Sequence, residues 1–235
     1  MAIITLTTDL GTKDSDLASV KGSFFSQIKY VNIIDITNHI EPFNIQQAAY
    51  VLRNCFKDFP LGSIHIVSVD DELSITNEHI AVKAEGHYFI GADNGMFSLL
   101  FDESPDEVYN INIVPDENHR TFPTKDVFVQ VACHIGRGGT LELIGSKVDD
   151  ITKRTNFQPV IEENVIRGMA MYIDAYGNVT TNITRSLINF AGKGRKFSIV
   201  FRRSDYNINE LKQNYSEVPE GEKLALFSTN DHLEI

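Results

Sequence analysis

Acidic side chains occur close to predicted strand ends in this 235-residue sequence, where a ligand could be bound. The segment "TTDLGTKDSDLASVKG", residues 7–22, contains Asp9, Asp14 and Asp16 but only one early glycine, Gly11. Three carboxylates would repel a phosphate, so this is not a glycine-rich phosphate-binding loop. Carboxylates suit a ligand that offers hydroxyl groups, such as those of a ribose, together with positive charge.

Three further polar segments follow predicted strands and could contribute to the same site. They are "VDDE" at residues 69–72, which contains Asp70, "ADNG" at residues 92–95, which contains Asn94, and "IDAYGNVTTNI" at residues 173–183. Taken singly, an Asp or Asn after a strand is most often a helix cap or a turn residue. Because α/β proteins bind ligands beyond the carboxyl ends of their strands, the recurrence of these segments predicts a shared acidic cavity.

The elements that would position these residues alternate between strand and helix in the first part of the chain. Strands are predicted at residues 3–7, 31–37, 64–69 and 108–113, a hairpin at residues 79–93, and helices at residues 17–30, 45–56, 95–101 and 127–135. Such alternation predicts an α/β domain whose mostly parallel sheet is covered by helices on both faces.

The pattern changes after about residue 150. The segments "NVIRGMAMYID", "GNVTTNI", "KFSIVFR" and "EKLALFSTNDHLEI" are short, β-rich and joined by Gly, Asn and Asp turns. They predict a smaller antiparallel barrel or sandwich. We therefore predict an N-terminal domain at residues 1–150 and a C-terminal domain at residues 160–235, with the boundary in the polar segment 147–159.

Composition limits the classes of partner and the compartment. The net charge of -11 argues against nucleic acid or an anionic membrane as the main partner. Cys55 and Cys133 lie in apolar helical patterns, which predicts free thiols in a reducing compartment, and no signal segment or membrane-spanning run is visible. We expect a cytoplasmic protein. The seven histidines lack metal-ligand spacing, so no metal site is predicted.

Taken together, six segments resemble a known family. They are "ITLTTDLGTKDSDLASVKG", "IIDITNHIEPFNIQQAAYVL", "FPLGSIHIVSVD", "YFIGADNGMFSLL", "TFPTKDVFVQVACHIG" and "YIDAYGNVTTNI", and they span nearly the whole chain in the right order. On these segments the sequence resembles the S-adenosyl-L-methionine hydroxide adenosyltransferases, also called SAM hydrolases, which are relatives of the fluorinase and chlorinase enzymes.

The resemblance implies a fold, an assembly and a reaction. It implies a Rossmann-like N-terminal domain, a small β-barrel C-terminal domain and a homotrimer whose ligand sites lie between subunits. The reaction would be attack by water or hydroxide at C5′ of the ribose of S-adenosyl-L-methionine, which releases adenosine and L-methionine. No metal or cofactor is implied, because the sulfonium group is already a good leaving group. The sequence ends at Ile235, so the C-terminal domain is expected to be short or truncated.

The resemblance also implies roles for individual residues. Asp9 would hold the ribose hydroxyls, Asp70 would be the catalytic aspartate, and Asp174 would act at the methionine end of the ligand with Asn178. The full predicted set of substrate-binding residues is Asp9, Phe43, Asn94, Thr124, Asp174, Tyr176 and Asn178, with Asp70 as the predicted catalytic residue.

Two positions depart from the pattern of the hydrolases. The sequence "SVDDELSITN" retains Asp70 but has Asn77 where the hydrolases have an arginine, and "FPTKD" has Pro123 where they have a histidine. Proline has no side-chain or backbone proton to donate. Two hypotheses therefore stay open. The first is an enzyme that hydrolyses S-adenosyl-L-methionine. The second is a sensing or sequestering protein that binds this compound or adenosine without turnover.

Overall fold

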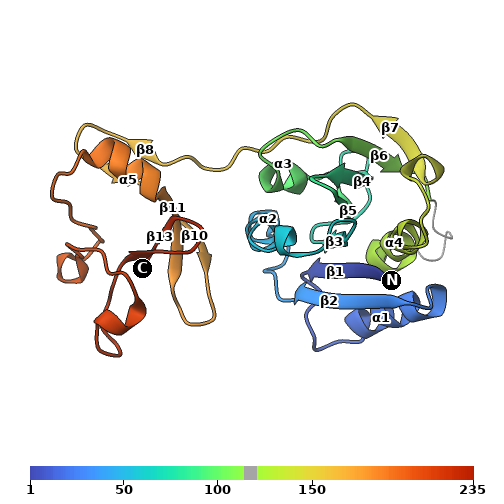
Figure 1. Cartoon of the computed structure of the whole chain (residues 1–235), viewed down its shortest axis with the longest axis horizontal. Coiled ribbons are helices and arrows are strands. Elements are labelled where there is room, and N and C mark those ends of the chain that lie inside the picture. Colours follow the sequence, from blue (N-terminus) through green and yellow to red (C-terminus); the bar gives the residue numbers. More distant parts are fainter. Residues whose placement is uncertain (114–120) are drawn as a thin grey trace. The chain divides into compact units, whose positions relative to one another are not determined.

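The computed structural model describes residues 1–113 and 121–235, apart from the side chain of Ser204. The chain forms two compact units, Met1–Thr155 and Asn156–Ile235 (Figure 1). The division between them falls within the polar segment 147–159. None of the described helices has the length and apolar character that spanning a bilayer requires.

A seven-stranded sheet forms the centre of the N-terminal unit, with the strand order β2-β1-β3-β5-β4-β6-β7. Its strands are β1 (Ala2–Thr8), β2 (Val31–Thr37), β3 (Ile64–Ser68), β4 (His79–Ala84), β5 (His87–Ala92), β6 (Glu107–Ile111) and β7 (Gly145–Val148). The pairs β1–β2, β1–β3 and β3–β5 are parallel, whereas β4 and β7 run antiparallel to their neighbours. This confirms a mixed α/β unit with a large, mostly parallel sheet.

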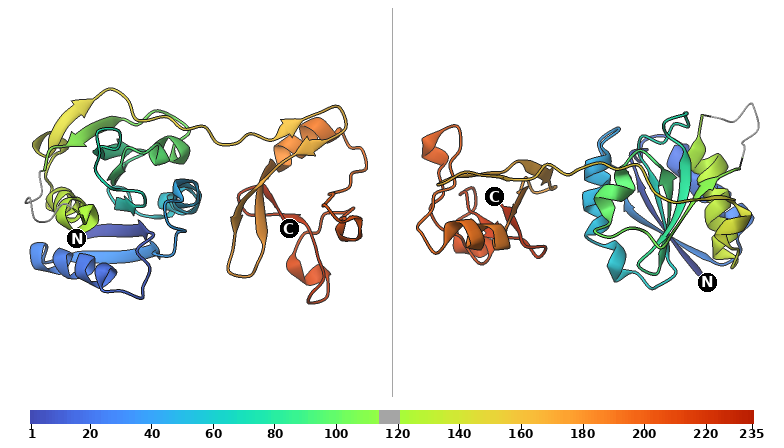
Figure 2. Two further views of the ribbon diagram at one scale, coloured as in Figure 1. Left: turned by 180° about the vertical axis from the view of Figure 1, so that it is seen from behind. Right: turned by 90° about the horizontal axis from the view of Figure 1, so that it is seen from above.

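Helices cover both faces of this sheet (Figures 1 and 2). They are α1 (Asp16–Gln27), α2 (Ile45–Arg53), α3 (Met96–Leu100) and α4 (Val129–Gly136), with the shorter turns η1 (Phe56–Asp58), η2 (Thr124–Phe128) and η3 (Leu141–Leu143). Apolar residues of α1 and α4 pack in one buried cluster, and those of α2 and α3 pack in a second. The unit therefore has three layers, with the sheet between two layers of helices.

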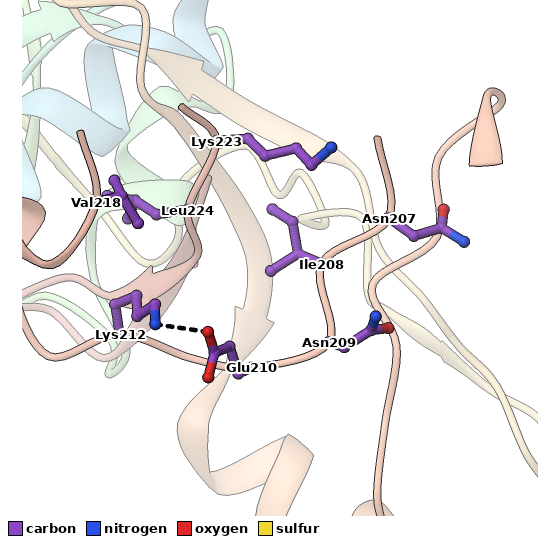
Figure 3. Close-up of a pocket in the computed structure, with 8 residues that line it drawn as sticks. All are labelled: Asn207, Ile208, Asn209, Glu210, Lys212, Val218, Lys223 and Leu224. Carbon is purple, nitrogen blue, oxygen red and sulfur yellow. Dashed lines mark hydrogen bonds and ion pairs between the residues drawn. The ribbon is translucent and has the colours of Figure 1, made fainter. Parts of the chain in front are cut away.

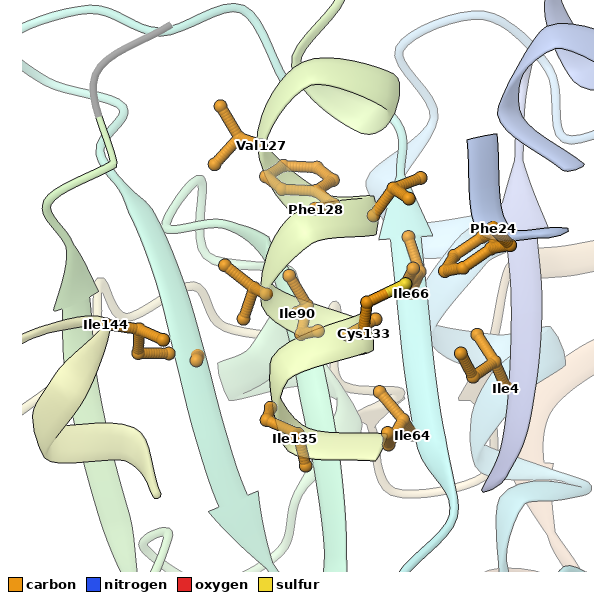
Figure 4. Packing of buried hydrophobic residues seen from close by; sticks show 14 of the residues in the cluster. Ile4, Phe24, Ile64, Ile66, Ile90, Val127, Phe128, Cys133, Ile135 and Ile144 are labelled. Atoms are coloured by element: carbon orange, nitrogen blue, oxygen red, sulfur yellow. The ribbon is translucent and has the colours of Figure 1, made fainter. Parts of the chain in front are cut away.

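Successive side chains of a strand point to opposite faces of the sheet, so the strands contribute residues to both buried clusters. Ile64 and Ile66 of β3 belong to the cluster with α1 and α4, whereas Val67 belongs to the cluster with α2 and α3. Figure 4 shows the first cluster, in which Cys133 of α4 faces Ile66 and Phe24 of α1 lies beside them. A strand buried on both faces needs apolar or hydrogen-bonded side chains at every position, which explains its nearly continuous apolar sequence.

Several boundaries differ from those predicted from the sequence. The helix predicted at residues 45–56 ends at Arg53, and Phe56–Asp58 forms a separate 3-10 turn. The α-helix predicted at residues 127–135 begins at Val129, and a π-helical turn, Thr124–Phe128, takes up the first two predicted residues. Strand β7 was not predicted, because "GSKV" has no run of apolar residues and becomes a strand by pairing with β6.

Two buried histidines face each other on neighbouring strands, His65 on β3 and His87 on β5. His65 Nδ1 lies 2.7 Å from Thr5 Oγ1, and His65 Nε2 lies 3.2 Å from His87 Nδ1. The ring of His65 also stacks on Phe89. Burial lowers the pKa of His65 from 6.5 to about 3, with a further contribution from His87, and burial also lowers the pKa of His87.

From the lowered pKa values of these histidines we expect acid to destabilise the N-terminal unit. Above the unfolded pKa of 6.5, His65 is neutral in both states and the full stability is present. As the pH falls from there towards the folded pKa of about 3, only the unfolded state takes up the proton. The unfolding free energy should therefore fall by up to about 1.4 kcal/mol per pH unit for this one group.

Urea denaturation between pH 5 and pH 7 measures this slope, with the pH range set by the shift of His65. His65→Gln should flatten the pH dependence, because the amide can replace the hydrogen bonds without titrating. His39→Gln, at an exposed position, is the matched control and should keep the slope of the wild type. An equal slope in wild type and His65→Gln would contradict the prediction.

The C-terminal unit contains a separate antiparallel sheet with the strand order β10-β11-β13-β12. Its strands are β10 (Ala170–Ile173), β11 (Val179–Thr184), β12 (Leu226–Phe227) and β13 (His232–Glu234), and the unit also contains the hairpin β8 (Val160–Ile161) and β9 (Ile166–Arg167), the helix α5 (Arg185–Gly192) and the turns η4 (Ser204–Tyr206) and η5 (Tyr215–Glu217). An antiparallel sheet region is thus confirmed. No pairing among the described strands closes it, so the barrel stays a prediction.

Candidate functional site

The loop after β1 brings Asp9 and Phe43 together. The Phe43 N–H donates to Asp9 Oδ2 over 3.1 Å. Phe43 has a left-handed backbone (φ 65°), and the residue is 74% exposed. Desolvation raises the pKa of Asp9, the bond from Phe43 opposes this rise, and the charges of Asp71 and Asp70 add to it. Asp70 and Asp71 therefore lie close enough to Asp9, at the carboxyl ends of β1 and β3, for their charges to raise its pKa.

Asp70 follows β3 at the same edge of the sheet. Its backbone is left-handed (φ 51°), and its side chain is exposed. Asn94, which is 8% exposed, donates from Nδ2 to the carbonyls of Val69 and Asp70, each over 3.0 Å. Asn94 Oδ1 accepts the Met96 N–H over 3.1 Å at the start of α3. Asn94 therefore holds the turn that carries Asp70, and its amide is used within the protein.

Asn77 closes the same loop from its other side. Its Nδ2 donates to the carbonyls of Asp70 (3.0 Å) and Glu72 (2.9 Å). Its buried Oδ1 has no hydrogen-bond partner among the described residues. Asn77 thus supports the backbone of the loop, which is a different task from presenting the positive charge of an arginine.

Asp71 is a polar residue of this site that was not predicted from the sequence. Its Oδ2 accepts hydrogen bonds from Ser68 Oγ (2.8 Å) and Thr124 Oγ1 (3.0 Å), and these two hydroxyls lie 2.5 Å apart. His79 Nε2 donates to the carbonyl of Asp71 over 2.8 Å. The only signal in the sequence was the second acid of "VDDE", which gives no indication of which carboxylate meets Thr124.

Thr124 lies at the start of η2, directly after Pro123. Both residues are buried, and Thr124 is 1% exposed. The backbone N–H of Lys125 bonds to the carbonyl of Phe122, and within the described residues no ion pair joins Lys125 to Asp70. The structure therefore brings Thr124 to Asp71 rather than to Asp70.

The C-terminal unit holds Asp174, Tyr176 and Asn178 in one loop between β10 and β11. Asp174 Oδ1 accepts the N–H groups of Tyr176 (2.8 Å) and Asn178 (2.9 Å), and Asp174 Oδ2 accepts Asn178 Nδ2 (2.9 Å). Desolvation raises the pKa of Asp174, but the hydrogen bonds from Asn178, Tyr176 and Gly177 outweigh it, so the net shift is downward. The Asp174 carboxylate is therefore kept ionised, and Tyr176 is 92% exposed beside it.

The predicted residues thus form two groups, one in each unit. Asp9, Phe43, Asp70, Asn94 and Thr124 lie on loops or turns beyond the carboxyl ends of the parallel strands. The other three share the loop of the C-terminal unit. No three His, Cys, Asp or Glu side chains in the described ranges gather in a group that could hold a metal ion.

A groove of about 390 Å³ lies elsewhere in the C-terminal unit (Figure 3). It is lined by Asn207, Ile208, Asn209, Glu210, Lys212, Val218, Lys223 and Leu224. Lys212 Nζ pairs with Glu210 over 2.5 Å, so the charge of this lysine is already compensated. None of the predicted site residues is among the residues that line it.

Comparison with known proteins places this geometry in a family. The N-terminal domain of SAM hydroxide adenosyltransferase matches residues 4–145, and the C-terminal domain matches residues 168–235. A protein of Methanocaldococcus jannaschii named (R)-S-adenosyl-L-methionine hydrolase is 31% identical over 196 residues, which cover 80% of this chain and 69% of the relative. A fluorinase of Actinopolyspora mzabensis is 26% identical over 224 residues, which cover 82% of this chain and 75% of the relative.

A solved structure agrees with these matches. An uncharacterized conserved protein from Thermotoga maritima has a TM-score of 0.85 and 27% sequence identity, with 99% of this chain and 90% of that chain covered. The matched domains account for most of the sequence, in the order in which the two units follow each other. The chain therefore belongs to the SAM hydroxide adenosyltransferase family.

Proposed function

We propose that this protein hydrolyses S-adenosyl-L-methionine to adenosine and L-methionine. The observation that carries the proposal is the gathering of Asp9, Asp70 and Asp71 beyond the carboxyl ends of β1 and β3. A ligand with a ribose diol and a sulfonium cation matches these acceptors and this charge. The relative at 31% identity that is named (R)-S-adenosyl-L-methionine hydrolase supports the same reaction.

In this proposal the residues of each unit bind a different part of the ligand. Asp9 accepts hydrogen bonds from the two ribose hydroxyls, while the exposed side chain of Phe43 flanks the nucleoside. Asp70 orients the attacking water, because its carboxylate takes no hydrogen bond from the described residues and its backbone is fixed by Asn94. The ionised carboxylate of Asp174 holds the ammonium group of the methionine part.

The chemical step is a substitution at C5′. A bond forms between the water oxygen and C5′ while the bond between C5′ and sulfur breaks, and its electron pair stays on sulfur as a neutral thioether. The water proton leaves to a carboxylate and then to solvent, so one proton is released in each turnover. We propose that no cofactor takes part, since the sulfonium is already a leaving group and the protein needs mainly to position water.

We further propose that the protein is a cytoplasmic homotrimer with its sites between subunits and that its C-terminal unit closes into a small barrel. Large apolar side chains are exposed in the C-terminal unit, including Ile173 (60%), Tyr176 (92%) and Phe190 (73%), and they support burial against other surfaces. Cys55 and Cys133 are free thiols, which suits a reducing compartment. Light scattering of the purified protein tests the trimer.

The reaction is tested by incubating the purified full chain with S-adenosyl-L-methionine and separating the products by chromatography. We expect equal amounts of adenosine and methionine. Asp70→Asn should slow turnover by about tenfold, because an amide oxygen still accepts a hydrogen bond from water but lacks the charge that holds it in place. Binding of the substrate should be retained, as calorimetry would show.

The matched control is Asp14→Asn, which removes one charge from the exposed loop before α1. Its turnover should equal that of the wild type. Equal rates for the wild type and Asp70→Asn would show that Asp70 does not orient the water. No product from the wild type would overturn the proposed hydrolysis.

A second candidate function is binding of S-adenosyl-L-methionine or adenosine without turnover. Two observations favour it, since the amide of Asn77 is used to hold the loop backbone and Pro123 has no proton to donate. Binding in the calorimeter without release of adenosine or methionine would support this function over hydrolysis.

A further inference from the structure

Asp71 forms a closed triangle of oxygen atoms with two buried hydroxyls. Ser68 Oγ and Thr124 Oγ1 lie 2.8 Å and 3.0 Å from Asp71 Oδ2, and 2.5 Å from each other. Ser68 and Thr124 are each 1% exposed, so their hydrogen bonds must be made within the protein. The triangle joins the end of β3 to the first residue of η2, which are 56 residues apart in the sequence.

Counting protons shows what this triangle can offer to a ligand. Two hydroxyls supply two protons for three oxygen contacts while the carboxylate is ionised. Both protons are therefore used inside the triangle, and neither hydroxyl has a proton left to donate to an anion. The second carboxylate oxygen, Oδ1 of Asp71, takes no hydrogen bond from the described part of the chain and can accept one from water.

The position of the Asp71 carboxylate affects which nucleophile the site can accept. The N–H of Asp9 donates to the carbonyl of Ser68 over 3.2 Å, and the hydroxyl of Ser68 donates to Asp71, so Asp71 lies close to the residue that is proposed to hold the ribose. The charge of Asp71 accordingly contributes to the raised pKa of Asp9. A halide needs hydrogen-bond donors and positive charge, whereas a carboxylate beside it repels it. Water both donates and accepts hydrogen bonds, and it carries no charge.

We infer that Asp71 is a specificity-determining residue that admits water and excludes halide ions as the nucleophile. This inference rests on the proposed function and deepens it, because relatives of this chain include both a hydrolase and fluorinases by name. Asp71 supplies fixed negative charge and an acceptor for water, and the Ser68 and Thr124 hydroxyls hold that carboxylate in place. With water the products are adenosine, methionine and a proton; with chloride they would be 5′-chloro-5′-deoxyadenosine and methionine.

The test is a product analysis of Asp71→Asn in high chloride. The wild type should form adenosine and no chlorinated nucleoside. In Asp71→Asn the charge is lost and an amide donor is gained, so adenosine formation should fall by about tenfold. The share of chlorinated nucleoside should rise above that of the wild type. The dissociation constant for S-adenosyl-L-methionine should stay within about threefold, so that the loss appears in kcat rather than in KM.

Two control variants separate this role from a general effect of charge or folding. Asp14→Asn removes one exposed carboxylate and should keep both the rate and the product ratio. Thr124→Val removes one hydroxyl from the triangle but keeps the charge of Asp71, so it should still exclude chloride. Thermal unfolding by circular dichroism checks that each variant is folded.

A second readout does not depend on turnover. The chlorine NMR line width, measured with adenosine bound, should show no specific chloride binding in the wild type and excess broadening in Asp71→Asn. Specific chloride binding by the wild type would overturn the inference, even if Asp71→Asn fails to fold. Exclusion of chloride by folded Asp71→Asn would also overturn it. If the wild type forms no adenosine, the proposed hydrolysis fails, while the NMR comparison still decides the role of Asp71.

Discussion

Replacing Asp9 by asparagine is expected to weaken the binding of S-adenosyl-L-methionine by about a hundredfold. In the proposed complex one carboxylate accepts both ribose hydroxyls, and hydrogen bonds to a charged group contribute about 1.5–3 kcal/mol each. An amide has one acceptor oxygen and no charge, so the free energy of binding should weaken by about 3 kcal/mol, which corresponds to the hundredfold change in the dissociation constant. Isothermal titration calorimetry of wild type and Asp9→Asn measures it.

The pH dependence of binding provides a second check on Asp9. Desolvation and the charges of Asp71 and Asp70 raise the pKa of Asp9, so this carboxylate gains a proton at a higher pH than an exposed aspartate. Affinity for the cationic ligand should therefore fall on acidification in the wild type, and less so in Asp9→Asn. Asp14→Asn serves as the charge-matched control. Unchanged affinity in Asp9→Asn would contradict the role of Asp9 as the ribose acceptor.

Replacing Phe89 by alanine is expected to destabilise the N-terminal unit by about 3–5 kcal/mol, because the large cavity left in a close-packed core cannot collapse fully. Phe89 is fully buried, and its ring lies 4.9 Å from the ring of Phe101 and 5.4 Å from that of Phe56, in edge contacts. It also stacks on His65 with ring centroids 4.9 Å apart, so its removal would leave one face of that ring without its packing partner.

Urea denaturation monitored by circular dichroism measures this loss. Because the chain has two units, the transition should be compared between variants of the full chain rather than assumed to be a single two-state step. Phe25→Ala is the control, since Phe25 lies on α1 and is 65% exposed, and it should change the unfolding free energy little. Equal losses for Phe89→Ala and Phe25→Ala would contradict the packing shown by the structure.

The strands and helices of the N-terminal unit could be predicted because their apolar residues are regularly spaced. Buried parallel strands such as residues 3–7 and 64–69 are apolar at most positions, and this signal is local. Strand β7 and the π-helical turn Thr124–Phe128 were not predictable in the same way. Their conformations depend on pairing with β6 and on packing against the sheet, which no local pattern encodes.

The candidate site was predictable to the extent that its residues lie in recognisable segments. Asp9, Asp70 and Asn94 follow predicted strands, and parallel strands bring such residues to one edge of a sheet. The sequence could not show that the amides of Asn94 and Asn77 are spent on holding the backbone at Asp70. Hydrogen-bond partners depend on distances between segments, and these are set only when the segments pack.

The family, the α/β order of the N-terminal unit and the acidic character of the site can be predicted from the order of the residues alone. Which of the two adjacent aspartates bonds to Thr124 depends on the folded backbone. Because Asp70 has a left-handed backbone, the chain turns there, and the next carboxylate reaches a hydroxyl 53 residues away. Two adjacent aspartates share nearly all of their neighbours in the sequence, so no local pattern distinguishes them. The conformation of the backbone decides the direction in which each side chain points.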